Sequence, residues 1–490
     1  MANSSVHTEY VEKLKSIFTG MVVYKDAARN KFISSMGIPS FLRDWLVMRF
    51  SDETGRIDTA SLQTYIEQFI PRREQWERLK TSMVKEGARI KFLAKIRVEM
   101  DVKTGEGLFT LPDFGFPSRK YEAIILDKVL LEKKQVLFED VESWGVLQLE
   151  WRLGAIPGFK NHGAIVLTDF QPFKPYKVDL SFFQEARAHF SLDEWLDTLL
   201  MAVDYSPQGF LNNKQKLTLI SRLLPFVEPR LNIIELAPKG TGKSYLFSQI
   251  SKYGWLISGG NVTRARLFYD VAKRLPGLIT RHDYLALDEI QSITFPDEDE
   301  IRGALKGYLE SGEFRVGDYK GIGEAGFVLL GNIKQRMMSE EKNMFQELPR
   351  IFHESALLDR FHGFILGWKL PRMKENMKAQ GWGLNAEYFS EIMHELRKDI
   401  RYRAIVDELL DIPKGADTRD TEAIKRLSTG YIKLLFPHAT SPNALTNQDF
   451  QQYCFNPAFH MRQIIRKQLN ILDAEYSINM PDINVRGNHG

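Results

Sequence analysis

The spacing of hydrophobic residues divides this chain of 490 residues into parts with different predicted structure. In the first part, apolar residues recur every three to four positions, as Val11, Leu14, Ile17 and Phe18 do. This spacing places them on one face of an α-helix. It continues through residues 38–50 and again through 59–83, and it predicts a helical region over residues 1–85.

From residue 90 the hydrophobic period shortens to two. Apolar residues at 90, 92, 94, 96, 98 and 100 alternate with the basic residues Arg89, Lys91, Lys95 and Arg97. This alternation is typical of a strand with one apolar and one polar face. A turn signal at 103–107 and further segments at 121–131, 134–140, 144–151 and 163–170 predict more strands. We therefore expect a β-rich, OB-like domain over residues 86–175, whose basic strand face either follows a DNA backbone or is simply solvated.

The prolines at 172 and 175 mark the next boundary. Residues 176–375 begin with helices and then alternate strand and helix, which predicts an α/β core. Residues 376–490 are mostly helical and are expected to form a lid and a C-terminal tail. The predicted fold class is therefore multidomain α/β.

Composition excludes several classes of protein but does not by itself indicate a function. The formal net charge of +3 is too small to indicate nucleic-acid binding without local basic patches. The single cysteine excludes an internal disulfide framework and a cysteine-rich zinc site. We find no signal-peptide pattern and no apolar run long enough for a membrane helix. We therefore expect a cytoplasmic protein without a membrane partner.

Residues 231–244 predict a strand, a glycine-bearing loop and a helix in direct succession. Gly240 and Gly242 let the backbone turn its N–H groups toward an anion, and Lys243 can reach the outer phosphates of ATP. Ala237 stands where the usual pattern G-x-x-x-x-G-K-[ST] has its first glycine, a difference of one methyl group. The alternative is a strand–turn–helix that carries Gly-Lys-Ser by chance. The candidate ATP-binding residues are Pro238, Lys239, Gly240, Thr241, Gly242, Lys243, Ser244 and Tyr245.

A second apolar strand, at 284–287, ends in the two carboxylates Asp288 and Glu289. In a phosphate-loop fold this strand lies beside the first one. Asp288 and the Ser244 hydroxyl would then hold Mg²⁺, and Glu289 would polarise the attacking water. ATP and Mg²⁺ are the expected cofactors.

Three further positions resemble motifs of the AAA+ ring ATPases, in the branch that contains the MCM helicases. An apolar strand ends at Asn332, where that class places a water-orienting polar residue. The segment Leu-Leu-Asp-Arg-Phe contains Arg360 and is similar to the arginine finger that acts on a neighbouring subunit, and Arg419 begins a lid helix that is similar to a sensor motif. The resemblance also implies a DNA-gripping pore hairpin at 313–322, with Lys320 and Arg315 as contacts. The alternative is an ordinary surface hairpin.

A closer resemblance covers most of the chain. The segments Ile-Pro-x-x-Leu-x-x-Trp-Leu, Glu-Leu-Ala-Pro-Lys-Gly-Thr-Gly-Lys-Ser and Leu-Leu-Asp-Arg-Phe-His-Gly are similar to the BrxL family, the Lon-related AAA+ proteins of BREX phage-defence systems. This resemblance implies a hexameric ring, possible stacking of two rings, DNA binding and contacts with other BREX proteins. The Asp-Gly-Pro-Ser-Ala segment of Lon and its lysine partner are not found. We therefore expect a short form without proteolysis.

Two interpretations from different classes remain. The first is an AAA+ ATPase that engages duplex DNA and translocates on it, clamps it or remodels it. The second is an ATP-dependent remodeller or scaffold of protein partners. The basic strand face and Lys320 favour the first. A metabolic kinase is a weaker third interpretation, because it would leave Arg360 and Arg419 without a role.

Overall fold

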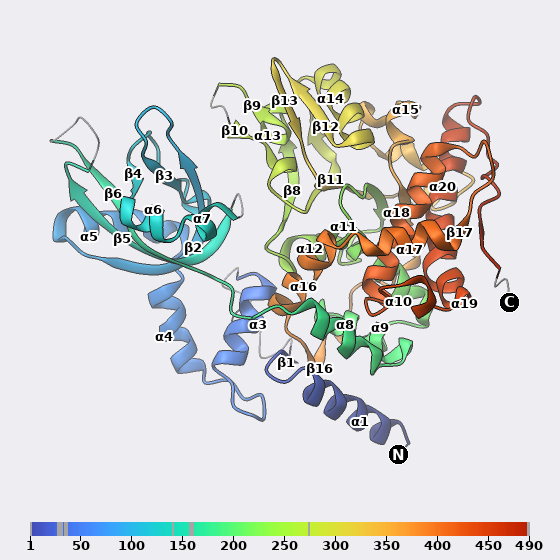
Figure 1. Ribbon diagram of the computed structural model, residues 1–490, viewed down its shortest axis with the longest axis horizontal. Coiled ribbons are helices and arrows are strands. Elements are labelled where there is room, and N and C mark those ends of the chain that lie inside the picture. Colours follow the sequence, from blue (N-terminus) through green and yellow to red (C-terminus); the bar gives the residue numbers. More distant parts are fainter. Residues whose placement is uncertain are drawn as a thin grey trace. The chain divides into compact units, whose positions relative to one another are not determined.

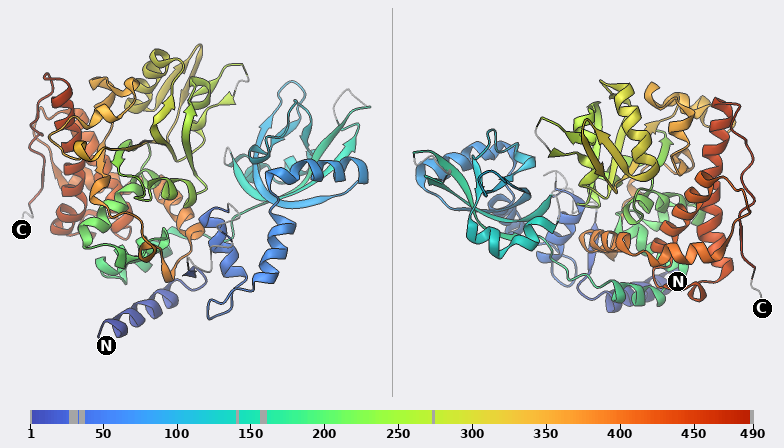
Figure 2. Two further views of the ribbon diagram at one scale, coloured as in Figure 1. Left: turned by 180° about the vertical axis from the view of Figure 1, so that it is seen from behind. Right: turned by 45° about the horizontal axis from the view of Figure 1, so that its top comes forward.

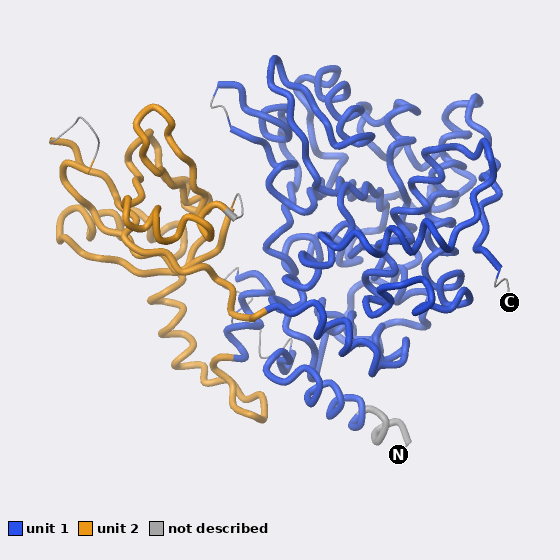
Figure 3. The backbone as a smooth tube through the Cα atoms, in the orientation of Figure 1, with its two compact units in different colours: residues 1–48, 178–490 blue, residues 49–177 orange. Residues whose placement is uncertain are grey.

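The computed structural model describes residues 2–26, 33, 38–139, 142–155, 161–272 and 275–487. Its backbone forms two compact units, coloured separately in Figure 3: residues 49–177 form one, and residues 1–48 with 178–490 form the other. These limits do not coincide with the boundary at residue 85 expected from the sequence. The first 48 residues belong with the long C-terminal part. The fold is mixed α/β, as expected.

The smaller unit contains α4 (Thr59–Phe69), α5 (Trp76–Glu86), two shorter helices described below and a closed barrel (Figure 1). The barrel strands are β2 (Ile90–Met100), β3 (Gly107–Thr110), β4 (Ala123–Ile125), β5 (Ser143–Leu153) and β6 (Gly163–Pro172). Their order is β2-β3-β4-β6-β5, and β2 also pairs with β5. β4 and β6 run parallel, whereas the other neighbouring strands run antiparallel.

The alternation along β2 is confirmed, because Phe92, Ala94 and Ile96 lie in the barrel core. The strand expected at 134–140 is wrong, and the one at 121–131 is mostly wrong. Helices α6 (Asp127–Glu132) and α7 (Lys134–Glu139) occupy these residues, and their Val129 and Leu137 are buried in the barrel core. Short apolar runs fit a strand or a buried helix equally well, so periodicity alone does not separate the two.

The N-terminal segment of the larger unit includes α1 (Ala2–Ile17) and α3 (Ser40–Arg49), which confirms helix there. Residues 27–32 and 34–37 of the expected helical region lie outside the described residues. One strand was not expected: β1 (Val22–Asp26) pairs antiparallel with β16 (Gln380–Leu384). The N-terminal segment is therefore joined to a strand more than 350 residues further along the chain.

The centre of the larger unit is a five-stranded sheet in which all neighbouring strands are parallel. Its order is β15 (Gly363–Leu366), β7 (Ile233–Ala237), β14 (Gly326–Asn332), β11 (Tyr284–Thr294) and β8 (Gly254–Asn261). Every residue of β7 is buried. This interior strand therefore reads as a nearly continuous apolar run, as expected for a parallel strand covered on both faces.

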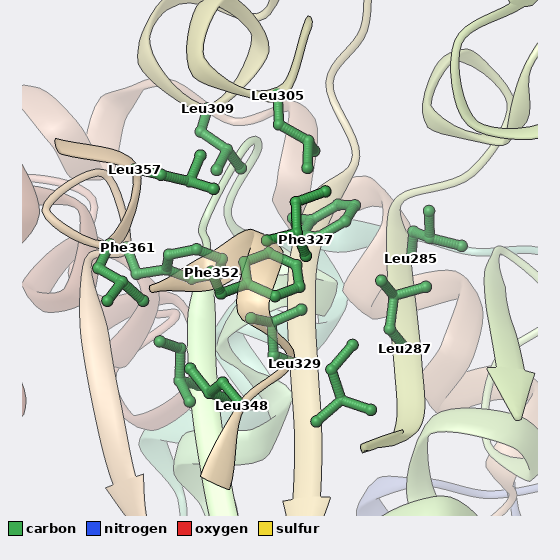
Figure 4. Packing of buried hydrophobic residues seen from close by; sticks show 14 of the residues in the cluster. Leu285, Leu287, Leu305, Leu309, Phe327, Leu329, Leu348, Phe352, Leu357 and Phe361 are labelled. Atoms are coloured by element: carbon green, nitrogen blue, oxygen red, sulfur yellow. The ribbon is translucent and has the colours of Figure 1, made fainter. Parts of the chain in front are cut away.

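A hydrophobic core packs on one face of this sheet. Figure 4 shows Phe327 and Leu329 of β14 beside Leu305 and Leu309 of α14 (Glu298–Ser311). Leu357 of α15 (Ser355–Leu358) joins the same cluster. These contacts hold α14 against the strands that carry the candidate site.

Helices surround the sheet, and the helical C-terminal part is confirmed. Figure 2 shows them from two further sides, and Figure 1 labels them as α8 (Leu180–Ala188), α9 (Leu192–Ala202), α10 (Asn213–Ile220), α11 (Leu224–Val227), α16 (Ala386–Lys398), α17 (Arg401–Leu409), α18 (Thr418–Leu435) and α20 (Asn456–Leu472). Shorter elements are α12 (Lys243–Gln249), α13 (Arg264–Leu267), α19 (Asn447–Asp449), β9 (Tyr269–Asp270), β10 (Leu275–Pro276), β12 (Glu313–Val316), β13 (Tyr319–Ile322), β17 (Leu410–Asp411) and β18 (Asn484–Val485). In the part of the chain that the structure describes, no helix has both the length and the apolar character needed to cross a bilayer.

Candidate functional site

The glycine-bearing loop follows β7 and leads directly into α12, as the sequence predicts. Gly240 and Gly242 have φ angles of +82° and +76°, a left-handed conformation that favours glycine. At Gly242 the space is also limited, because a Cβ atom there would lie 2.2 Å from the Tyr205 hydroxyl oxygen. Both the conformation and the packing therefore require glycine at 242.

Three consecutive carbonyl oxygens of this loop are held by hydrogen bonds. The Met373 N–H donates to Gly240 O (2.7 Å), Arg222 Nη1 donates to Thr241 O (3.0 Å), and the Tyr205 hydroxyl donates to Gly242 O (3.1 Å). In a planar trans peptide the C=O and the following N–H point in opposite directions. The N–H groups of residues 241, 242 and 243 are therefore turned away from these donors, as an anion-binding nest requires.

A buried ion pair lies under the loop. Arg222 Nε is 2.9 Å from Glu235 Oε2, and both side chains are fully buried. Burial opposes the charge, but the Glu235 carboxylate outweighs it and holds the pKa of Arg222 above its usual value. The remaining Arg222 donor is the one that holds Thr241 O. A buried charge pair between β7 and the segment Ser221–Leu223 thus fixes the orientation of one peptide of the loop.

The structure brings Lys243 together with the polar ends of the neighbouring strands. Lys243 Nζ is 3.1 Å from Asn332 Oδ1, at the end of β14. The pKa of Lys243 is lowered, chiefly by burial, although Glu235, Asp288 and Glu289 oppose the shift. Asp288 on β11 is buried and belongs to the same edge of the sheet. The predicted residues Asp288 of β11 and Asn332 of β14 therefore lie beside the loop that follows β7.

Glu289 adopts an uncommon backbone conformation, with φ of +49°. Its N–H donates to Asp288 Oδ1 (2.8 Å), and its carbonyl accepts from the Ser292 hydroxyl (2.8 Å). Its side chain is exposed. A left-handed residue other than glycine costs about 1–3 kcal/mol, and such strain is concentrated at functional sites.

Several residues of the site were missed from the sequence. Gln291 bonds the backbone of Asn332 twice, at 2.7 Å to its carbonyl and 3.2 Å from its N–H. Tyr205, Arg222 and Met373 hold the loop carbonyls. The one available signal was a single charged residue in each of two otherwise uncharged segments, Arg222 within 219–227 and Glu235 within 231–237.

The oxygen ligands of the site suit Mg²⁺. Ser244 and Asp288 offer a hydroxyl and a carboxylate, and this ion prefers hard oxygen ligands. Among the residues described by the structure, no group of three or more His, Cys, Asp or Glu side chains could hold a metal. One or two protein ligands are enough for Mg²⁺, which usually keeps waters and takes substrate phosphate oxygens.

The side chain of Tyr245 is engaged elsewhere. Its hydroxyl donates to Asp204 Oδ2 (2.6 Å) and lies 2.7 Å from the Ser40 hydroxyl. This residue was predicted to contact the nucleotide. Its hydroxyl joins the first turn of α12 to the N-terminal segment of the chain.

Arg360 and Arg419 lie together, away from the loop. Arg360 Nε is 3.0 Å from Glu310 Oε2, and Arg419 Nη2 is 3.4 Å from Glu310 Oε1. Partial burial opposes ionisation of Glu310, but the two guanidinium groups hold its pKa below the usual value. Arg419 also donates to Asp359 (2.8 Å), and the fully buried Arg462 holds the carbonyls of Asp359 and Phe361.

The sheet separates these arginines from the loop of the same chain. Arg360 precedes β15, whose first residue Gly363 pairs with Ile233, the first residue of β7. The glycine-bearing loop follows the last residue of β7. Because the strands are parallel, Arg360 and the loop lie at opposite edges of the sheet.

The hairpin of β12 and β13 places two predicted basic residues on one exposed face. Arg315 is directly opposite Lys320, and both side chains are exposed, whereas Phe314 and Val316 are buried. Lys320 Nζ is 3.2 Å from Glu313 Oε2. Like charges opposite each other on one face repel.

The basic residues of the barrel have acidic neighbours. Arg89 lies 2.6 Å from Glu150, and Lys95 lies 3.9 Å from both Asp113 and Glu142. Burial lowers the pKa of Arg97, which is only partly exposed, while Lys91 is exposed. The alternation of β2 was predicted, but the neighbouring carboxylates were not.

The Arg222–Glu235 pair provides a test that separates folding from nucleotide binding. Arg222→Met should destabilise the larger unit by about 3–5 kcal/mol, because it leaves a buried carboxylate without a partner. Arg222→Met combined with Glu235→Leu should recover most of that stability. ADP binding should remain weakened in the double variant, because Thr241 O still lacks its donor. Chemical denaturation and calorimetric titration measure the two effects, and normal ADP affinity in the double variant would contradict this role of Arg222.

Comparison with known proteins identifies the family. The family model described as "Lon-like protease BrxL-like, ATPase domain" matches residues 165–481, and that described as "BREX system Lon protease-like protein BrxL N-terminal" matches residues 16–151. The chain is 28% identical over 465 residues to a "Lon-like protease BrxL" of Escherichia coli O9:H4 (strain HS), covering 94% of this chain and 64% of that protein. A protein of the same name from Bacillus cereus (strain H3081.97) is 28% identical over 442 residues, with 87% and 62% coverage. This chain thus spans less than two thirds of the length of these relatives. We conclude that the chain belongs to the BrxL family.

Proposed function

We propose that this chain is an AAA+ ATPase of a BREX-type phage-defence system that binds duplex DNA and uses ATP to translocate on it, clamp it or remodel it. The observation that carries the proposal is the phosphate loop, whose N–H groups are oriented by three held carbonyls. The match to the family's ATPase domain supports ATP as the substrate. The relatives are named as Lon-like proteases, but we propose no proteolysis for this chain.

The arrangement supports a division of roles. The loop N–H groups and Lys243 bind the phosphates. Ser244 and Asp288 hold Mg²⁺, which when bound neutralises phosphate charge. Glu289 polarises the attacking water and Asn332 orients it. The order of the sheet supports the AAA+ class. The strand before the phosphate loop, β7, lies between β15 and β14, which are the last two strands of this sheet along the chain.

The position of the two arginines supports a homo-oligomeric ring, which we expect to be hexameric. Arg360 and the loop of its own chain lie at opposite edges of the sheet. A neighbouring copy that presents this edge would bring Arg360 and Arg419 to the phosphates. There they would stabilise the negative charge of the transition state, as an arginine finger does. Glu310 would release them on assembly.

The hairpin is the proposed DNA contact of the larger unit. Arg315 and Lys320 lie opposite each other on an exposed face and repel each other. Glu313 pairs with Lys320, and a phosphate backbone would neutralise Arg315 and compete with Glu313 for Lys320. The barrel has five strands with one parallel pair, β4 and β6, and helices between β4 and β5. This topology supports an OB-type barrel, and such barrels often bind nucleic acids.

The carboxylates around Arg89 and Lys95 favour a second candidate function for the barrel. A surface of mixed charge suits a protein partner better than a polyanion. In this alternative the ATPase acts on proteins and the barrel recruits another defence protein.

Glu289→Gln tests the assignment of the water-activating residue. The variant keeps the size of the side chain and removes its charge, so ADP and ATP should bind with unchanged Kd. Turnover should fall by about a hundredfold or more, because the general base is lost. Steady-state phosphate release and calorimetric titration measure the two. Near-normal turnover would contradict this role.

DNA binding is tested by ATP turnover with and without duplex DNA over a salt titration. We expect DNA to stimulate turnover at low salt, and the apparent affinity to fall as salt rises. The double variant Arg315→Gln/Lys320→Gln should weaken DNA binding and reduce the salt slope by about 0.9 per lost phosphate contact. Lys378→Gln, in an exposed pair with Glu375, is the matched control. Turnover that ignores DNA but responds to a BREX protein would favour the alternative.

A further inference from the structure

A cluster of buried charges lies beside the phosphate loop and joins three separate parts of the chain. Asp204 is its centre: Oδ1 accepts from Lys25 of β1 and from Arg43 of α3, each at 2.9 Å. Oδ2 accepts from the Tyr245 hydroxyl of α12 at 2.6 Å. The side chains of Lys25, Arg43 and Asp204 are 2%, 8% and 10% exposed, so water contributes little to their pairing.

Asp204 and its neighbour Tyr205 reach two points of the phosphate region. Asp204 follows α9 and has a φ angle of +68°, a left-handed turn that ends the helix. The next residue, Tyr205, directs its hydroxyl to Gly242 O. The carboxylate of Asp204 accepts a hydrogen bond from the hydroxyl of Tyr245, which is three residues after Gly242. One short turn therefore contacts both the loop and the first turn of α12.

The N-terminal helix α3 holds this turn in place. Arg43 Nη2 contacts both oxygens of Asp204 at 2.9 Å and also lies 2.7 Å from Asp44. Asp44 Oδ2 accepts from the Ala386 N–H (3.1 Å) at the start of α16. α3 ends at Arg49, and the chain continues from there into the unit of residues 49–177. Any displacement of α3 therefore acts on the Asp204 turn.

We propose that Asp204 and Tyr205 are positioning residues of the phosphate loop, and that Arg43 sets their position from α3. Nucleotide binding and the docking of α3 are then coupled. Thermodynamic linkage makes this coupling reciprocal. If docking of α3 through Arg43 raises nucleotide affinity by some factor, bound nucleotide raises the equilibrium constant for docking of α3 by the same factor. The segment that leads into the barrel unit thus senses the occupancy of the phosphate site. This inference rests on the proposed binding of ATP.

The test is a double-variant cycle in the full chain, with ADP titrated by calorimetry. Tyr205→Phe keeps the ring and removes the hydroxyl that holds Gly242 O, so the Kd for ADP should rise about three- to tenfold, the effect of one hydrogen bond. Arg43→Lys keeps the charge but loses the two-pronged contact with Asp204, and it should raise the Kd similarly. Residues that act through one another are not additive. The Kd of the double variant for ADP should therefore be no higher than the higher of the two single-variant Kd values.

A second measurement separates positioning from a merely structural role. ADP should slow hydrogen exchange of the α3 backbone in the wild-type protein, and this protection should disappear in Tyr205→Phe. Arg401→Lys, which alters an exposed arginine that pairs with Asp399, is the control and should change neither Kd nor exchange. If Arg43→Lys does not fold, Tyr245→Phe takes its place in the cycle. Tyr245→Phe removes the hydrogen bond between the Asp204 carboxylate and α12.

Two results would overturn the inference. The first is a Kd increase in the double variant that equals the product of the two single-variant increases. The second is a loss of stability in the variants while their ADP affinity and the protection of α3 by ADP stay unchanged. Absence of ADP binding by the wild-type protein would instead refute the proposed function. The two failures are therefore distinguishable.

Discussion

Neighbouring strands of the central sheet all run in the same direction, and this polarity governs where each candidate side chain lies. The loop after β7, Asp288 of β11 and Asn332 of β14 gather at the edge where the strands end. Arg360 precedes β15 and lies at the edge where they begin. A strand of five residues spans about 16 Å, farther than a side chain reaches. The phosphate loop and Arg360 are therefore separated within one chain, and under the proposed function they would combine only between chains.

At the phosphate edge, orientation comes from buried groups rather than from the loop alone. Arg222, Tyr205 and the Met373 N–H each hold one loop carbonyl, so the N–H groups are oriented before any anion arrives. Preorganised dipoles need no reorganisation when negative charge develops. The cost is a fully buried ion pair, Arg222 with Glu235, and the strained backbone of Glu289. These are the features that distinguish this region from an ordinary strand, turn and helix.

Local patterns in the sequence predicted the local parts of this structure. The phosphate loop, the two adjacent carboxylates of β11 and the alternation of β2 each depend on a few consecutive residues. The missed features depend on distant ones: Met373 contacts a residue more than a hundred positions earlier, and β1 pairs with β16 near residue 380. The helices at 127–139 were read as strands because their apolar runs are too short to show a period. The carboxylates that neighbour Arg89 and Lys95 come from other strands and loops, which no local pattern reveals.

The most direct test of a site divided between chains is ATP turnover by mixtures of two inactive variants. Lys243→Ala lacks its own phosphate contact but keeps Arg360, whereas Arg360→Ala keeps the phosphate loop but lacks the arginine for its neighbour. In a random equal mixture of ring subunits, about one quarter of the interfaces combine an intact loop with an intact arginine. We expect each variant alone to be inactive and the mixture to recover turnover in about that proportion. Normal turnover by Arg360→Ala alone, or no recovery in mixtures that co-assemble, would contradict the account.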